Sequence, residues 1–405
     1  MKVLFFFSGG FDIEHSSTIL MTNVLEDCLE QNLTVHYIIP NETGENKNCP
    51  EHLENHSHLS YDVIYKKSPA KNHFVRRYLD GILYSFRCAK YIRKQKDADV
   101  IYVQSTPTAF WNILIARVFG HKTPIIYSVL DMFPGSTIAS GVMPQKILQI
   151  IFFFIQKRAY QLSSHIMCMS SDMKQKIIIQ GVDKEKITYF NTWFDTNNLK
   201  YVEDKDNSFI SEFKMDKKKF YVQYAGNVGY VFDVDLFIDV ANSLKEHSDI
   251  VFQLVARGSQ LEYLTSEVEK KSLVNVEIIP LQPVERISEV YSSCNLQFIP
   301  LKHGVIGNSF PSKLAHVMNC HKTFVCCIDE NADFFSIANN KRIGICCTNK
   351  NHEDAVKAIL KFYKNIESIS ECQENAYTFS EQVFSRKQNT QIIIEQIKKQ
   401  GVKKN

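Results

Sequence analysis

The chain has 405 residues, a length that predicts two domains, because an ordinary domain holds about 100 to 200 residues. Hydrophobic residues make up 44% and charged residues 22%, close to the globular average, so we expect the chain to fold throughout. The formal net charge of +3 is too small to make the whole surface attract nucleic acid, so we predict no nucleic-acid partner.

The positions of the cysteines and the lengths of the apolar runs indicate in which cellular compartment the protein is expected. The cysteines include no C-x-x-C pair and fall largely in apolar runs, so we expect buried thiols, no structural metal site and a reducing compartment. The apolar start at residues 3–7 is short for a signal peptide. The apolar run at residues 147–155 is shorter than the roughly 18 residues of a membrane span. These features predict a cytoplasmic protein.

In the first half, short apolar runs alternate with helical periodicity. They predict strands at residues 3–7, 34–39, 100–103, 125–129 and 166–169. Runs this apolar are typical of strands that are buried on both faces of a parallel sheet. Gly9 and Gly10 end the first run, and a helix follows. Such a turn brings backbone N–H groups near an anion, although a tight turn needs glycine even without a ligand.

Residues 66–96 form a basic segment that contains a single acid, Asp80. Apolar residues recur there at helical spacing, at Val75, Leu79, Ile82, Phe86 and Ala89. Basic residues are interleaved with them, at Arg76, Arg77, Arg87, Lys90 and Arg93. A basic amphipathic helix suits an anionic membrane surface. Alternatively, the apolar stripe packs on the sheet and the cations are solvated.

A charged stretch at residues 203–219 separates the halves, after which the alternation starts again. Strands are predicted at residues 220–224, 251–256, 276–279, 296–300 and 323–328. The fold class is therefore α/β, with two Rossmann-like parallel-sheet domains and a ligand cleft beyond the carboxyl ends of the strands. We predict a first domain at residues 1–200, a second at 201–381, and a helix within 382–405 that braces the first.

A second glycine turn opens the second domain. Gly226, Asn227 and Gly229 follow the strand at residues 220–224, and helical spacing begins after Asp233. This turn is a candidate phosphate loop, in which Asn227 either bonds a nucleotide or closes the turn. The sequence has neither a G-x-G-x-x-G nor a Walker lysine, which argues against dinucleotide oxidoreductases and P-loop enzymes.

Two lysines follow the strand at residues 296–300. Ser312 stands at the start of a predicted helix and Lys313 in its first turn, where a cation is unfavourable beside the positive end of the helix. An anion bound there, and shared with Lys302, would explain this placement. Alternatively, both lysines are solvated surface residues.

Six motifs are spread over almost the whole chain. They are SGG at residues 8–10, DVIYVQSTP at 99–107, YSVLDMFP at 127–134, NTWFD at 191–195, YAGNVG at 224–229 and PSKLAH at 311–316. Together they resemble the family 4 glycosyltransferases of the GT-B fold. The resemblance is to the branch that includes the N-acetyl-L-fucosamine transferases of capsule, O-antigen and colanic acid synthesis.

The resemblance implies an enzyme that moves a sugar, with retention of configuration, from a nucleotide diphosphate sugar to a glycan or polyprenyl-linked acceptor. The implied catalytic residues are Lys302, Lys313 and Asp131, although Asp131 could also be a turn former. The implied donor-binding residues are Gly226, Asn227, Gly229, Arg257, Ser312 and His316, and Gly9 and Gly10 would join Asp131 at the acceptor. No metal or other cofactor is implied, because lysines and helix ends supply the positive charge.

Departures from the family pattern leave alternatives open. The family's glutamate pair falls at Asn308 and His316, and neither is acidic, although an imidazole can still bond a hydroxyl. Arg257 stands where an acid is usual and could bind phosphate or form a surface salt bridge. The alternatives are a GT-B subunit that binds sugar nucleotide or glycan without turnover, and a sugar-nucleotide epimerase. A lipid-linked acceptor and the basic helix predict a peripheral position on the inner face of the plasma membrane.

Overall fold

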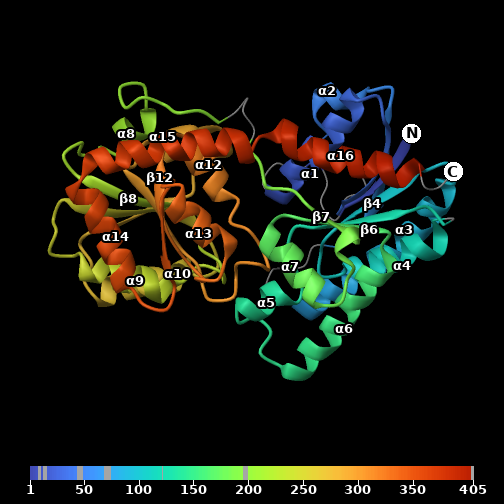
Figure 1. The fold of residues 1–405 in the computed structure, drawn as a ribbon, viewed down its shortest axis with the longest axis horizontal. Helices are drawn as coiled ribbons and strands as arrows, with labels where there is room; N and C mark the ends of the chain where they lie inside the picture. The colour runs from blue at the N-terminus through green and yellow to red at the C-terminus, as the bar shows by residue number, and fades with distance from the viewer. Residues whose placement is uncertain are drawn as a thin grey trace. The chain divides into compact units, whose positions relative to one another are not determined.

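The computed structural model describes residues 1–7, 11, 16–42, 49–67, 74–120, 122–194 and 199–402. The chain divides into two compact units, each built on one sheet with helices packed around it (Figure 1). The first unit comprises Met1–Ser136, Met143–Asn191 and Lys387–Asn405. The second comprises Thr137–Val142 and Thr192–Arg386.

The first unit is built on a seven-stranded sheet with the order β3-β2-β1-β4-β5-β6-β7. Its strands are β1 (Lys2–Phe6), β2 (Thr34–Asn41), β3 (Leu59–Tyr65), β4 (Val100–Gln104), β5 (Ile125–Val129), β6 (His165–Cys168) and β7 (Ile187–Tyr189). Every neighbouring pair is parallel. β4 and β5 are buried at every position, which explains their unbroken apolar sequence.

Helices connect these strands. They are α1 (Ser16–Glu30), α2 (Glu51–Glu54), α3 (Phe74–Lys94), α4 (Ala109–Phe119), α5 (Gly135–Ala139), α6 (Lys146–Leu162), α7 (Ser171–Ile179), the 3-10 helix η1 (Lys184–Lys186) and the C-terminal α16 (Arg386–Val402). Gln31, which follows α1, makes two hydrogen bonds to α16: it donates to Gln391 at 2.8 Å and accepts from Lys398 at 2.7 Å. The last helix of the chain therefore packs on the first unit.

The second unit is built on a six-stranded parallel sheet with the order β10-β9-β8-β11-β12-β13. Its strands are β8 (Phe220–Asn227), β9 (Ile250–Arg257), β10 (Val276–Pro280), β11 (Leu296–Pro300), β12 (Thr323–Ile328) and β13 (Ile345–Thr348). Its helices are α8 (Ser208–Glu212), α9 (Val234–Ser243), α10 (Leu261–Lys270), η2 (Val284–Arg286), α11 (Ile287–Ser292), α12 (Lys313–Asn319), α13 (Asp333–Asn340), α14 (Glu353–Lys364) and α15 (Ile366–Val383). The predicted α/β class with two parallel sheets is thus confirmed.

Both faces of the second sheet are covered by apolar cores. Tyr224 of β8 and Cys327 of β12 belong to one cluster, whereas their neighbours Ala225 and Cys326 belong to the other. Because successive side chains of a strand point to opposite faces, the two clusters are the cores above and below the sheet. Ten of the eleven cysteines are buried and free, as predicted, and Cys49 is partly buried.

Some elements differ from the sequence prediction. The edge strands β3, β7 and β13 were not predicted. They are short or only partly buried, so they lack the long apolar run that marked the central strands. The helix expected over residues 382–399 is interrupted at Phe384 and Ser385, because this segment pairs with Phe194: the Phe194 N–H donates to the Phe384 carbonyl at 3.3 Å. Among the helices described, none is both long and apolar enough to cross a membrane.

Candidate functional site

The glycine turn at the carboxyl end of β8 lies directly against the side chain of Lys313, at the start of α12. Gly226 has a φ of +137°, a conformation that L side chains rarely adopt. A Cβ on Gly226 would lie 2.3 Å from Cε and 2.8 Å from Nζ of Lys313. Glycine is therefore required here for two reasons, the backbone conformation and the closeness of the lysine.

The Lys313 ammonium group rests on Tyr224, which shares a face of β8 with Gly226. Nζ donates to the Tyr224 hydroxyl at 2.5 Å and lies 4.2 Å from the ring centroid. The same hydroxyl donates to the Asn227 carbonyl at 2.8 Å, so the turn, the tyrosine and the lysine are linked. No carboxylate neutralises Lys313 in the contacts described, and burial lowers the pKa of Lys313 to about 7.

The loop after β9 locks the same turn from the other side. Gly258 has a φ of +147°, and a Cβ there would lie 2.2 Å from the Val228 carbonyl oxygen. The Val228 N–H donates to the Arg257 carbonyl at 2.7 Å, and the Val228 carbonyl accepts from the Gln260 N–H at 3.0 Å. The backbone of the turn is thus held in place before any ligand binds.

Lys302 borders the far end of this turn. Its N–H donates to the Val231 carbonyl at 3.0 Å, and Leu301 bridges Phe232 next to it. Its half-buried side chain lies near Asp233, the residue that caps α9. Burial raises the pKa of the Asp233 carboxyl, and the nearby Lys302 ammonium opposes that rise. The structure therefore places Lys302 and Lys313 along one loop, at opposite ends.

A buried carboxylate organises the loop that follows Lys302. Asp329, directly after β12, accepts from the Gly304 N–H at 2.9 Å and contacts the ring of the exposed His303. Asn308 donates to the Gly304 carbonyl at 2.6 Å. Asn308, one of the two positions where the family pattern has glutamate, therefore has its amide turned back into its own loop.

His316, the other such position, lies one turn after Lys313 on α12. Its ring stacks on Tyr291 with an interplanar angle of 6°. The pKa of His316 is lowered to about 4: burial is the main cause and the Lys313 charge adds to it, against a hydrogen bond to the Ser312 backbone that raises the pKa. The imidazole is therefore neutral near pH 7. One nitrogen bonds to Ser312, which leaves the other as an acceptor, the role that a carboxylate would also have.

The other donor-site candidates surround this centre. Arg257 is exposed at the carboxyl end of β9, opposite Asn227 in the strand register. A Cβ on Gly229 would lie 2.6 Å from the Asn227 amide nitrogen, so Asn227 is folded over the turn. Ser312 is the N-cap residue of α12 but makes no side-chain capping bond. All these candidates lie at the carboxyl edge of the second sheet.

In the first unit, Asp131 lies exposed beyond the carboxyl end of β5. The hydroxyl oxygen of Ser105, which follows β4, accepts from the N–H groups of Leu130 and Asp131 at 2.9 and 3.3 Å. The next residues, Phe133 and Pro134, are joined by a cis peptide bond. Gly9 and Gly10, the other acceptor-site candidates, lie outside the described residues.

The basic helix predicted near residues 66–96 is α3, and three of the five residues of its predicted apolar stripe are exposed, whereas Ile82 and Ala89 are partly buried. Val75, Leu79 and Phe86 are exposed, whereas the buried face of α3 is formed by other residues, among them Tyr84 and Cys88. The alternative of a stripe covered by the sheet is therefore wrong for these three positions. Arg76, Arg77, Arg87, Lys90 and Arg93 are exposed as well.

Tyr224, Tyr291 and Asp329 were missed as site residues in the sequence. Tyr224 could have been found, because residues two apart on a strand share a face and Gly226 was already a candidate. Tyr291 and Asp329 meet His316 and Gly304 only through packing, and no spacing in the sequence points to them. Lys302 and Lys313 place positive charge beside the fixed backbone that these residues help to hold, an arrangement suited to an anion such as a diphosphate.

Two family models match the chain. Glycosyltransferase Family 4 matches residues 20–198, and Glycosyl transferases group 1 matches residues 205–379. The first match covers most of the first unit, and the second covers most of the second unit.

Individual proteins are similar over different lengths. The colanic acid biosynthesis glycosyl transferase WcaI of Escherichia coli K12 is 22% identical over 209 residues, 51% of each chain, so the match spans about half the length of this curated relative. Anabaena HepE, solved with UDP, has a TM-score of 0.73 at 15% identity over 98% of this chain and 100% of its own. Sucrose-phosphate synthase from Thermosynechococcus elongatus has a TM-score of 0.75 at 11% identity over the whole of both chains. These structural likenesses concern the fold alone.

Proposed function

Because this chain belongs to the family 4 glycosyltransferases and has the GT-B fold, we propose that it transfers a sugar from a nucleotide diphosphate sugar to a glycan in surface polysaccharide synthesis. The partial likeness to a colanic acid glycosyl transferase supports this process. Anabaena HepE was solved with UDP and with UDP-glucose, which supports a uridine diphosphate sugar as the first donor to test.

The observation that carries the proposal is the position of Lys313 over Gly226. Among the contacts described, no carboxylate partners this partly buried ammonium group, and such a charge is unfavourable unless an anion completes the site. The donor diphosphate would lie against the turn from Gly226 to Gly229, within reach of Lys313 at one end and Lys302 at the other. Both lysines then stabilise the negative charge that develops on the departing diphosphate, without need of a metal.

His316 and Arg257 would complete donor recognition. The neutral His316 ring would accept a hydrogen bond from a ribose or sugar hydroxyl, and the exposed Arg257 would contact phosphate. We further propose that transfer retains the anomeric configuration. The acceptor would be a polyprenyl-linked or other glycan held near Asp131, and the cations of α3 would bind an anionic membrane at the inner face of the plasma membrane.

The test of the activity is a transfer assay on the full chain. A panel of nucleotide diphosphate sugars is offered with lipid-linked acceptors, and the products are read by mass spectrometry. We expect transfer that persists in the presence of EDTA. Loss of transfer on chelation would refute the metal-free mechanism. If the chain binds donors but neither transfers nor hydrolyses any of them, the proposal that it is an enzyme is refuted.

That last outcome would favour a second candidate, a GT-B subunit that binds sugar nucleotide without turnover. The observation behind it is that Asn308 and His316 replace both glutamates of the family pattern, and that Asn308 is tied to Gly304. An epimerase is less well supported, because glycosyltransferase models match both halves of the chain.

The membrane part has its own test. Replacing Arg76, Arg77, Arg87 and Arg93 by glutamine should release the protein from vesicles that contain phosphatidylglycerol, since each cation near such a surface contributes about 1 kcal/mol. Unchanged binding of this variant would show that these arginines do not hold the membrane.

A further inference from the structure

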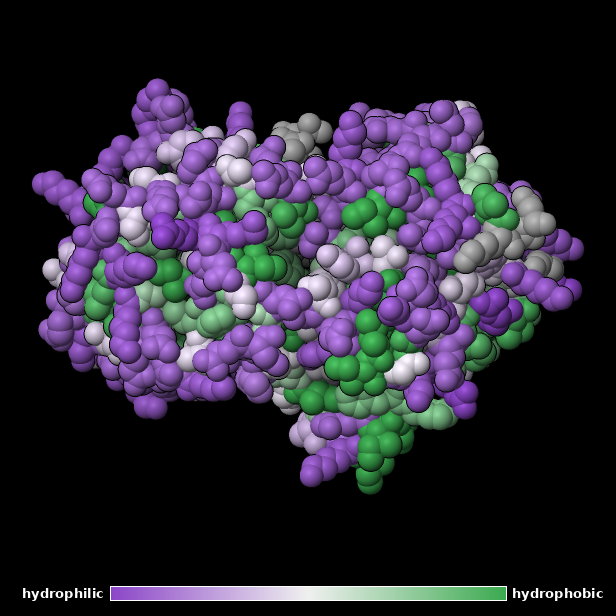
Figure 2. Space-filling model, in the orientation of Figure 1, coloured by the Kyte–Doolittle hydropathy of each residue, from purple (hydrophilic) through white to green (hydrophobic). Residues whose placement is uncertain are grey.

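Two neighbouring helices of the first unit expose apolar side chains in line with cations. We define the apolar ridge as Val75, Leu79, Leu83 and Phe86 of α3 with Ile147, Ile150, Ile151 and Phe154 of α6. Val75 is 71% exposed, Ile147 74% and Ile150 70%; single apolar side chains elsewhere are as exposed, but these eight are grouped on two helices. Figure 2 shows apolar surface gathered where Figure 1 places α6.

The two helices are in contact through aromatic rings. Tyr78 of α3 meets Phe152 of α6 with centroids 5.2 Å apart, and Phe152 meets Phe133 at 5.0 Å. Phe133 lies two residues after Asp131. The two helices thus meet at Tyr78 and Phe152 next to the candidate acceptor loop, and α4 packs against both of them, while the ridge side chains stay exposed.

Each exposed stripe changes from apolar to basic along its helix. On α3 the positions of Leu79, Leu83 and Phe86 are continued at helical spacing by Lys90 and Arg93. On α6 the stripe that contains Phe154 continues into Arg158, whose guanidinium lies 5.0 Å from the Phe154 ring. α6 contains no acidic residue, and α3 contains one.

The two stripes point the same way. α3 leads from β3 to β4 and α6 leads into β6, and because the strands are parallel, both helices run opposite to them. The exposed apolar side chains of both helices therefore lie towards the carboxyl edge of the first sheet, the edge where Asp131 lies, together with the exposed Arg76, Arg77 and Lys146. Their basic ends lie towards the opposite edge.

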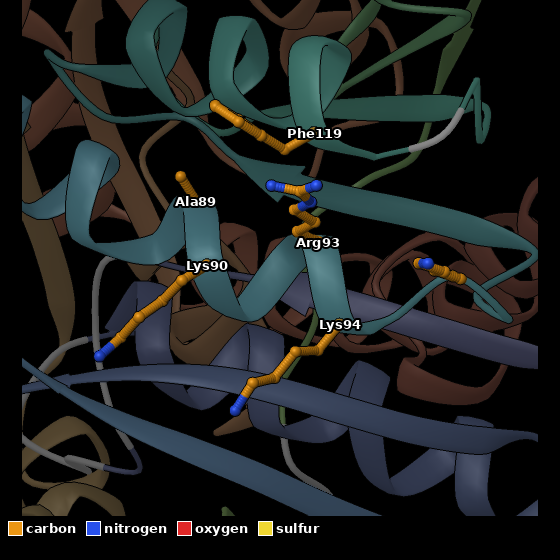
Figure 3. Close-up of a pocket in the computed structure, with 6 residues that line it drawn as sticks. Ala89, Lys90, Arg93, Lys94 and Phe119 are labelled. Atoms are coloured by element: carbon orange, nitrogen blue, oxygen red, sulfur yellow. The ribbon is translucent and has the colours of Figure 1, made fainter.

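A hollow at the basic end of α3 adds to this pattern. It has a volume of about 440 Å³ and is lined by Ala89, Lys90, Arg93, Lys94, Lys96 and Phe119. None of these six residues is acidic. Figure 3 shows the Lys90 and Lys94 side chains extending side by side from α3, while Arg93 turns towards Phe119 of α4.

We propose that the apolar ridge inserts among lipid acyl chains, with the basic ends of α3 and α6 among the anionic headgroups. A bilayer surface is apolar on one side and anionic on the other, so it matches both parts of each stripe. The proposal rests on the proposed function in that a lipid-linked acceptor would then emerge beside Asp131. It goes beyond attraction between charges, because insertion withdraws apolar side chains from water.

The decisive test compares the full chain with the double variant Ile150→Ser, Phe154→Ser on vesicles of phosphatidylcholine with phosphatidylglycerol. We expect partition into the vesicles to fall by about 100-fold, since burying each of these side chains favours the membrane by about 10-fold or more. The matched control is Val274→Ser, Ile366→Ser, at exposed positions of the second unit, and it should partition like the parent. An unchanged partition of the ridge variant would overturn the proposal.

A second measurement reads insertion directly. In Phe154→Trp, tryptophan emission should shift to shorter wavelength on vesicles and be quenched by brominated acyl chains, whereas Val274→Trp, at a position 90% exposed, should show neither change. Vesicle-bound Phe154→Trp without quenching would overturn insertion and leave only charge attraction. A dimer that the ridge variant dissociates, without loss of partition, would assign the ridge to a second copy of the chain.

UDP binding in solution separates this proposal from the proposed function. The ridge variant should bind UDP like the parent, because the donor residues lie in the second unit. Loss of partition with intact UDP binding supports insertion, whatever the outcome of the transfer assay.

Discussion

Replacing Lys313 by methionine should have opposite effects on the empty protein and on donor binding. Burial lowers the pKa of Lys313 from 10.5 to about 7. At about 1.4 kcal/mol for each factor of ten in proton affinity, the site disfavours the charge by at most roughly 5 kcal/mol. Methionine removes this penalty but loses the hydrogen bond and ring contact to Tyr224, worth about 1 to 3 kcal/mol together. We expect the variant to be more stable by about 2 kcal/mol at pH 7.

The stability gain should depend on pH in a defined direction. The folded pKa of Lys313 is below the unfolded value, so between about pH 7 and 10.5 the unfolded chain holds more protons than the folded one. The stability of the parent protein therefore rises with pH in this window relative to the variant. Urea unfolding should give the largest advantage of Lys313→Met at or below pH 7 and a disadvantage near pH 10.5, where the charge penalty has gone and only the loss of the Tyr224 contact remains.

Donor binding should change in the opposite sense. A charge-assisted hydrogen bond to phosphate contributes about 1.5 to 3 kcal/mol, so we expect UDP affinity to fall by about 10-fold to 150-fold in the variant. In the parent protein, the bound diphosphate raises the pKa of Lys313 again, and binding takes up a proton above about pH 7. Calorimetry in buffers of different ionisation enthalpy measures this uptake, which should disappear in Lys313→Met.

The control for these measurements is Lys357→Met, because Lys357 is an exposed lysine of α14 that is paired with Asp354 at 3.4 Å. It should bind UDP and unfold like the parent protein. If Lys313→Met binds UDP as tightly as this control, Lys313 does not hold the diphosphate. If it is less stable than the parent at pH 7, the cation is not penalised in the empty site.

Three further predictions concern neighbouring residues. Gly226→Ala should lower UDP affinity at least 10-fold, because the added methyl group displaces the Lys313 side chain. Isothermal titration that gives the same affinity as the parent would show that the turn can accommodate the methyl group. Gly258→Ala should destabilise the second unit by about 2 kcal/mol or more, the order of a strained-backbone penalty, because its Cβ would collide with the Val228 carbonyl. An unchanged melting temperature would show that this collision does not occur. His316→Leu should lower kcat/KM up to about 10-fold, and His316→Gln less, since only glutamine keeps an acceptor; equal losses would mean that the ring only packs.

Between pH 6 and 9, the parent protein should also show no titration of His316 in kcat/KM, because burial holds the pKa of that imidazole at about 4. A pH profile of the His316→Gln variant that loses an ionisation seen in the parent would contradict this assignment.

The sequence by itself determined the architecture and the places where backbone must be glycine. Unbroken apolar runs mark strands buried on both faces, and these runs predicted the central strands of both sheets. Gly226 and Gly229, at the end of β8, could be recognised because a turn at a strand end limits the side chain in the same local way in any fold, whereas Gly258 is identified only by its contact with Val228. The edge strands β3, β7 and β13 escaped prediction because half-covered or short strands have no such run.

Only the tertiary structure shows whether a given face of a helix or strand contacts the core, another side chain or solvent. Helical spacing showed that Val75, Leu79 and Phe86 share a side of α3, but spacing is the same for a buried and an exposed stripe, and only packing shows that this one is exposed. Likewise, the sequence pointed to Lys313, yet its rest on Tyr224, the stacking of His316 on Tyr291 and the role of Asp329 join residues far apart in the chain. Such contacts depend on how the strands are ordered in the sheet, which no local pattern contains.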